Sequence, residues 1–136
     1  MSRTTEILLH VGPTDDHHLE DLSFWLRDQA PRSDDRVEGS AGHLLPLTGQ
    51  LGMEAWGGDK APVATLWAGV ANYLDFDALV DRVGRVLWDE PDRVQLLLRD
   101  DGDPWFRLYM IRDGRIRRHG PAPASEDQDR LWEDGE

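Results

Sequence analysis

Residues 94–118 read VQLLLRDDGDPWFRLYMIRDGRIRR, a stretch that predicts three consecutive antiparallel strands. The segment Asp100-Asp101-Gly102-Asp103-Pro104 has the composition of a turn between the first two strands. Asp113-Gly114 is a strong signal for a two-residue hairpin between the second strand and the third. The strands of this predicted sheet are 94–99, 105–111 and 115–118.

A helix is predicted directly before this sheet. Asp75 can cap its first turn, and Trp88-Asp89-Glu90-Pro91 closes it. Between these two points the apolar residues recur at helical spacing. They are Phe76, Leu79, Val80, Val83, Val86 and Leu87.

Residues 61–74 fit two interpretations. Their apolar residues recur at a spacing that suits a helix, and Pro62 suits a first helical turn. Against this, Gly69 and Asn72 are poor helix formers. We favour a strand over residues 64–73, since a helix there would require a different α+β arrangement.

The N-terminal third predicts a strand and a helix, followed by loops. The apolar run at 6–11 ends at Gly12-Pro13, the punctuation expected after a strand. Thr14 or Asp15 can then cap a helix, which Pro31 stops. Further expectations are an apolar helix face at Leu19, Leu22, Trp25 and Leu26, a loop over 30–50 with a brief strand near 36–38, apolar residues around Pro46 covering a core edge, and a second strand over 51–56.

The order β-α-β-β-α-β, followed by a further hairpin, predicts an α+β fold. It suggests a ferredoxin-like sandwich, in which one layer of two main helices covers an antiparallel sheet. A length of 136 residues fits one domain, which we place at residues 1–120. Residues 121–136 are acidic and rich in Pro and Ala, and we expect a partly disordered tail.

The formal net charge of −12 is the strongest global feature of the sequence. It argues against nonspecific binding to nucleic acid or to an anionic membrane surface, because both carry the same sign of charge. It favours a basic protein partner, whose encounter it would accelerate. The alternative is that the acidity serves only solubility.

The cysteine-free composition excludes disulfides, thiolate metal sites and a cysteine nucleophile. The N-terminal segment lacks the layout of a signal peptide, and no apolar run approaches the length of a membrane span. A cytoplasmic location is therefore expected.

The motifs for catalysis and for cofactors are weak. A metal site built from His10, from His17 or His18, and from Asp16 is geometrically possible, but no regular ligand spacing supports it. The three aspartates of the 100–104 turn fail the EF-hand pattern and fit a hairpin turn better. No nucleophile elbow or phosphate loop occurs. We therefore expect no catalytic residues, no cofactor and no metal.

The aromatic residues predict both a core and a recognition surface. Trp25 and Trp88 are expected beneath the helices. Trp105 and Tyr109 are expected to share one face of their strand. If one helical layer covers one side of the sheet, the other side would present aromatic residues beside acidic ones, as recognition surfaces do. Alternatively, the C-terminal tail covers that side.

The segment LLLRDDGDP at 96–104, followed by FRLY at 106–109 and DGRI at 113–116, resembles the closing part of the seventh Imm family. This family comprises small immunity proteins of bacterial polymorphic-toxin systems. The resemblance covers the C-terminal half of the chain. It implies a cytoplasmic antidote that binds a toxin and blocks it, and the acidity would suit a toxin with a basic cleft.

The preferred hypothesis is a small acidic protein-binding module, and its more specific form is an immunity protein that occludes a basic toxin. The predicted partner-binding residues are Asp100, Asp101, Asp103, Trp105 and Tyr109. One alternative is a ligand-binding or enzymatic ferredoxin-like domain that forms a homodimer through its sheet. Another is an accessory domain whose acidity has no specific role.

Overall fold

The computed structural model describes residues 4–34, 36, 39–49, 55–58 and 60–119. Within these residues the chain follows the order β-α-β-β-α-β as far as β4 and ends in two hairpins. The elements are β1 (Thr4–Val11), η1 (Pro13–Asp15), α1 (Asp16–Asp28), β2 (Gly42–Pro46), β3 (Thr65–Asn72), α2 (Phe76–Arg85), η3 (Pro91–Arg93), β4 (Gln95–Asp100), β5 (Arg107–Arg112) and β6 (Arg115–Arg118).

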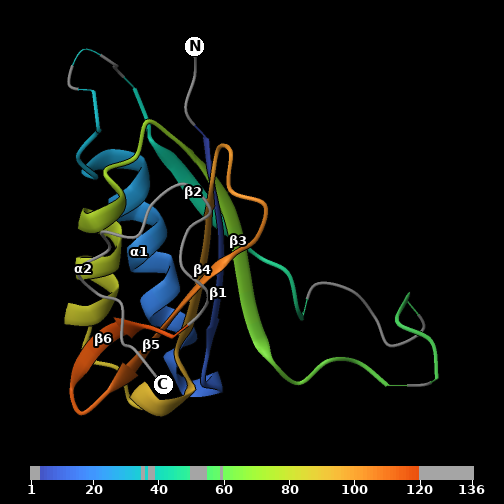
Figure 1. Cartoon of the computed structure of the whole chain (residues 1–136). Helices are drawn as coiled ribbons and strands as arrows, with labels where there is room; N and C mark the ends of the chain where they lie inside the picture. Colours follow the sequence, from blue (N-terminus) through green and yellow to red (C-terminus); the bar gives the residue numbers. More distant parts are fainter. Residues whose placement is uncertain (1–3, 35, 37–38, 50–54, 59, 120–136) are drawn as a thin grey trace.

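The six described strands form one antiparallel sheet in the order β2-β3-β1-β4-β5-β6. β1 pairs with β3 on one side and with β4 on the other, so the first strand of the chain lies inside the sheet. Both helices lie on the same side of the sheet (Figure 1). The fold is therefore α+β, an open six-stranded antiparallel sheet with one helical layer.

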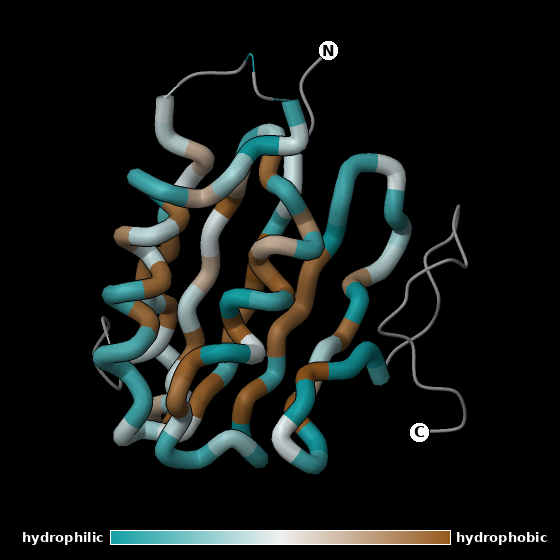
Figure 2. Tube along the Cα trace, turned by 90° about the vertical axis from the view of Figure 1, so that its left-hand side faces the viewer, coloured by the Kyte–Doolittle hydropathy of each residue, from teal (hydrophilic) through white to brown (hydrophobic). Residues whose placement is uncertain are grey.

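The core lies between the sheet and the helices. In β1 the side chains of Ile7, Leu9 and Val11 are buried, because alternate residues of a strand point to the same face. Apolar residues also follow the neighbouring strands and the helices (Figure 2). Full burial of one such side chain stabilises the fold by roughly 1.5–3 kcal/mol. The helices contribute Leu19, Leu22, Trp25, Leu26, Leu79, Val80 and Val83, which confirms the predicted face of the first helix. The predicted face of the second helix is confirmed only in part, because α2 ends at Arg85 and Leu87 beyond it is 87% exposed.

The two helices begin at the predicted capping residues, but the two aspartates act differently. The Asp75 carboxylate accepts the Ala78 N–H at 3.2 Å, so the predicted cap of α2 is confirmed. Asp15 occupies the cap position of α1 without capping it. Its carboxylate instead accepts the N–H groups of Asp89 and Glu90. Asp15 therefore connects the start of α1 to the loop that follows α2.

The preferred strand over 64–73 is confirmed as β3, whereas the second strand lies elsewhere than predicted. It is β2, at Gly42–Pro46, and residues 55–56 lie in a turn. Leu44 of β2 faces the core, and Pro46 is tolerated because β2 is an edge strand. Residues 50–54, residues 37–38 of the predicted brief strand and the tail at 121–136 lie outside the described residues.

Among the described helices, none combines the length and the apolar character that crossing a membrane requires.

Candidate functional site on the open face of the sheet

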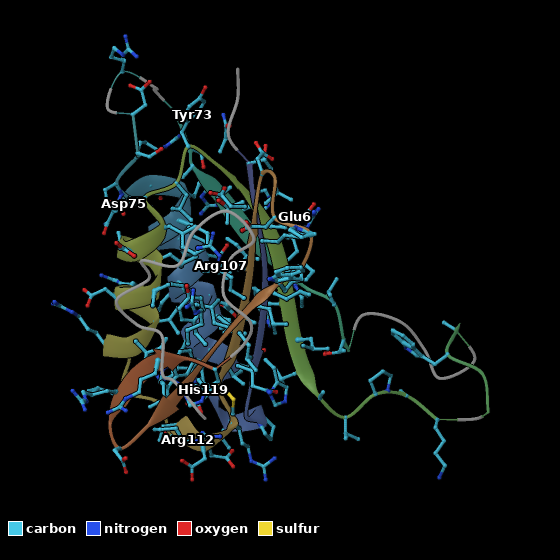
Figure 3. The ribbon with its side chains drawn as sticks, viewed as in Figure 1. Glu6, Tyr73, Asp75, Arg107, Arg112 and His119 are labelled. Atoms are coloured by element: carbon cyan, nitrogen blue, oxygen red, sulfur yellow. The ribbon has the colours of Figure 1, made fainter. Side chains whose placement is uncertain are left out.

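The side of the sheet away from the helices is here called the open face. It consists of the residues that alternate with the core residues along each strand, and they are half-buried or exposed. Figure 3 shows Glu6 on this side and Arg107 toward the helices. None of the described helices covers the open face (Figure 1). It is formed by His43, Leu45, Leu66, Ala68, Val70, Asn72, Thr4, Glu6, Leu8, His10, Gln95, Leu97, Arg99, Leu108, Met110, Arg112, Arg115 and Arg117.

An apolar row crosses the middle of the open face. The register places each residue of the row directly opposite the next one, over five neighbouring strands. Side chains in such cross-strand positions contact one another and present one continuous surface. The row is exposed most at the β2 edge, where Leu45 is 59% exposed. Its members, from β2 to β5, are Leu45, Ala68, Leu8, Leu97 and Leu108.

Two charged residues beside this row compensate each other. Glu6 and Arg99 are cross-strand partners, and the guanidinium donates to the Glu6 carboxylate through Nε at 2.9 Å and through Nη2 at 2.8 Å. Arg99 also donates to the Asp103 carbonyl at 3.1 Å. On the other side of the row, His10 lies 2.7 Å from the Arg93 carbonyl. The middle of the open face is thus apolar with one compensated ion pair, whereas its β5–β6 end carries Arg112, Arg115 and Arg117.

Two of the five predicted partner-binding residues are buried. Tyr109 is 1% exposed and belongs to the core, so the prediction that it lies on an exposed face is wrong. Tyr109 points to the helical side of β5 together with Ile111, which explains its burial. Trp105 does not share a face with it, because β5 begins at Arg107 and Trp105 lies outside the strand. Asp103 is 4% exposed and forms an ion pair with Arg107 at 2.9 Å. Neither side chain can contact a partner from this position.

The remaining three residues reach the surface at one end of the sheet. Trp105 is 41% exposed, Asp101 is exposed and Asp100 is half-buried. The carboxylate of Asp101 accepts the Thr4 N–H at 2.9 Å. Asp100 accepts the Thr5 hydroxyl at 3.2 Å. The turn thus uses its aspartates to hold the start of β1, and it still presents Asp101 and Trp105 to solvent.

The open face is aliphatic rather than aromatic, which corrects the expected composition of this surface. A signal for it was present in the sequence. The runs at 7–9, 96–98 and 108–111 are apolar in both phases of a strand. Such runs are typical of strands that are buried on both faces. In the described part of the chain, the helices bury only one of those faces.

The histidines considered as metal ligands do not come together. His17 and His18 stack at 4.1 Å between ring centroids, whereas His10 contacts Arg93. Within the described residues, no group of three or more potential His or carboxylate ligands is placed to hold a metal ion.

Three comparisons with known proteins give no match: no family model, no curated protein and no solved structure resembles the chain significantly.

Proposed function

We propose that this chain is an acidic protein-binding module that masks a basic protein partner with the open face of its sheet. The observation that carries the proposal is the apolar row of the open face, which none of the described helices covers. Contiguous apolar surface with a polar rim is typical of protein interaction sites. The exposed Asp101 and Trp105 extend this surface at one end of the sheet.

The charge of the chain supports a basic partner. A net charge of −12 keeps copies of the protein apart in solution, although each of them presents apolar surface. The same charge attracts a basic protein over a distance and accelerates the encounter. Affinity then comes from the apolar row toward its β2 end, away from the arginines at the β5–β6 end, and the acidity of the whole chain provides speed and selectivity.

The resemblance of residues 96–116 to the seventh Imm family makes the proposal more specific. In this form, the module is a cytoplasmic immunity protein that occludes a toxin with a basic cleft. A ferredoxin-like sandwich with an added C-terminal hairpin is part of the same proposal. The strand order β2-β3-β1-β4 and the chain order β-α-β-β-α-β support that assignment, with β5 and β6 extending the β4 edge.

A capture experiment with a matched control tests the contact surface. The tagged full chain is used to recover partners from the source cell, as the wild type and as Leu45→Asp and Val70→Asp. Leu45 is 59% and Val70 57% exposed, so both variants are expected to fold. Val63→Asp is the control, because Val63 is 96% exposed and lies before β3, outside the open face.

The expected result is one basic protein that the wild type and Val63→Asp recover and that both open-face variants lose. Expression of that protein alone should stop growth of a test host, and co-expression of the wild type should restore it. Recovery of the same proteins by all four chains would refute the open face as the contact surface. A recovered partner that is acidic or harmless would refute the basic-toxin form of the proposal.

A further inference from the structure

A cleft lies on the helical side of the molecule, between the first half of α1 and the end of α2. Figure 1 shows that the start of α1 and the end of α2 lie at the same end of the helical layer. Its volume is about 340 Å³, within the range of pockets that hold small molecules. The basic side chains in its lining are His18 of α1 and Arg82 and Arg85 of α2. Leu22, Val86 and Leu87 add apolar walls. The cleft therefore combines cations with apolar surface in a protein that is otherwise strongly acidic.

The two arginines differ in how they are held. Arg85 forms an ion pair with Asp81, with Nε 2.8 Å from the carboxylate. Arg82 has no carboxylate within ion-pair distance among the described residues, and its guanidinium lies 5.2 Å from the ring centroid of Trp25. This stacking restricts the guanidinium along the cleft wall and leaves its N–H donors available.

The opposite wall of the cleft is fixed by a buried carboxylate. Asp15 is fully buried and accepts the N–H groups of Asp89 at 2.7 Å and Glu90 at 3.0 Å. His18 lies 3.7 Å from the same carboxylate, through Nε2, and packs edge-on against Trp88 at 5.3 Å. These contacts hold the imidazole in place beside the cleft without a ligand.

Basic residues at the end of α2 also have a structural role, since cations stabilise a helix C-terminus. That role and the pair with Asp81 account for Arg85. These two roles do not explain why Arg82 stacks on Trp25 while His18 is fixed on the facing wall of the same cavity. The lining also contains one carboxylate, that of Asp21.

We propose that this cleft binds a small organic anion, with an oxyanion head group and an apolar body. Arg82 and Arg85 would bind the oxyanion, because guanidinium donors match the geometry of carboxylate and phosphate oxygens. His18 would add a third donor from α1. Leu22, Val86 and the exposed Leu87 would contact the apolar body. This site is independent of the protein-binding open face, which lies on the other side of the sheet.

Phenyl phosphate is a suitable probe, because it carries both required parts. We would titrate it into the ¹⁵N-labelled full chain at low salt and follow the backbone amide resonances. Saturable shifts are expected at cleft residues such as His18, Leu22 and Val86. Arg82→Gln should weaken the apparent affinity roughly tenfold, as expected for loss of a charge-assisted hydrogen bond. Phenol, which lacks the oxyanion, should cause no saturable shift in the cleft.

Arg36→Gln is the matched control, since it removes the same charge from an exposed position outside the cleft lining. It should leave the affinity for phenyl phosphate unchanged. Equal weakening in Arg36→Gln and Arg82→Gln would show a general charge effect and overturn the site. Absence of saturable shifts in the wild type, or shifts confined to residues outside the cleft, would also overturn it. The spectrum of each variant reports directly whether it is folded.

Discussion

At the scale of single residues, Asp15 has more influence on the fold than its place before a helix suggests. Its buried carboxylate accepts two backbone N–H groups that lie more than seventy positions later in the chain. Asp15→Ala leaves both donors without this acceptor, and bonds to a charged group are each worth about 1.5–3 kcal/mol. We expect the free energy of unfolding to fall by about 3 kcal/mol in urea denaturation.

Glu20→Ala is the control for this prediction, because Glu20 is an exposed acid on the same helix. Its effect should stay within about 0.5 kcal/mol. If Asp15→Ala costs no more than Glu20→Ala, Asp15 does not hold the loop after α2.

Two aspartates of the 100–104 turn should differ in their effect on stability: Asp103 is structural, and Asp101 is a surface residue. Asp103 and Arg107 form a largely buried ion pair, with side chains 4% and 14% exposed. Asp103→Ala would leave the Arg107 charge uncompensated, and loss of one partner of a buried pair costs about 3–5 kcal/mol. Asp101→Ala removes an exposed bond to Thr4 and should cost about 1 kcal/mol or less. Equal losses of stability for the two variants would contradict this division.

Because Asp103 is structural and Asp101 is exposed, the two residues are not equally suitable for testing whether the acidic turn binds a partner. Charge reversal at Asp103 would destabilise the fold and remove binding for an indirect reason. Asp101→Lys is the informative variant, because its side chain is exposed.

At the scale of elements, the pairing of β2 with β3 depends on a glycine. A Cβ on Gly69 would collide with the carbonyl oxygen of His43 on the neighbouring strand. Backbone in a paired strand cannot move aside cheaply, so Gly69→Ala should lower the free energy of unfolding by about 2 kcal/mol. The adjacent exposed Val70→Ala should cost less than about 1 kcal/mol. Hydrogen exchange of the β2 amides would show whether the loss is local to this edge, and unchanged protection there would refute the explanation.

The elements themselves were largely predictable, because their signals are local. Spacing of apolar residues located both helices, and Asp113-Gly114 located the last hairpin, where both residues have positive φ. β2 was missed because its only large apolar residues are Leu44 and Leu45, and they stand next to Pro46, a residue that argues against a central strand. Only the sheet shows that β2 is an edge strand, where a proline is tolerated.

The candidate site was less predictable, because its geometry depends on the phase of each strand. Leu8 and Leu9 are adjacent and both apolar, and so are Leu97 and Leu98, so local sequence does not indicate which of each pair faces the helices. An error of one residue reverses every side chain. Contacts between distant positions, such as that of Asp15 with the loop after α2, leave no local signal at all.

At the scale of the whole molecule, the open face and the net charge have opposite effects on self-association. Apolar surface favours the pairing of two copies through their sheets, whereas a charge of −12 on each copy opposes it. At low ionic strength this repulsion extends well beyond the roughly 10 Å Debye length of 0.1 M salt.

We expect a monomer by light scattering at low salt, for the wild type and for Leu45→Asp alike. Added salt weakens the repulsion, so any association of the wild type should rise with salt and be absent in Leu45→Asp. If the wild type forms a stable dimer at low salt and Leu45→Asp dissociates it, the open face binds a second copy of the chain. This result would refute the proposed basic partner. A dimer that Leu45→Asp leaves intact would place self-association elsewhere on the molecule and would contradict only the prediction of a monomer.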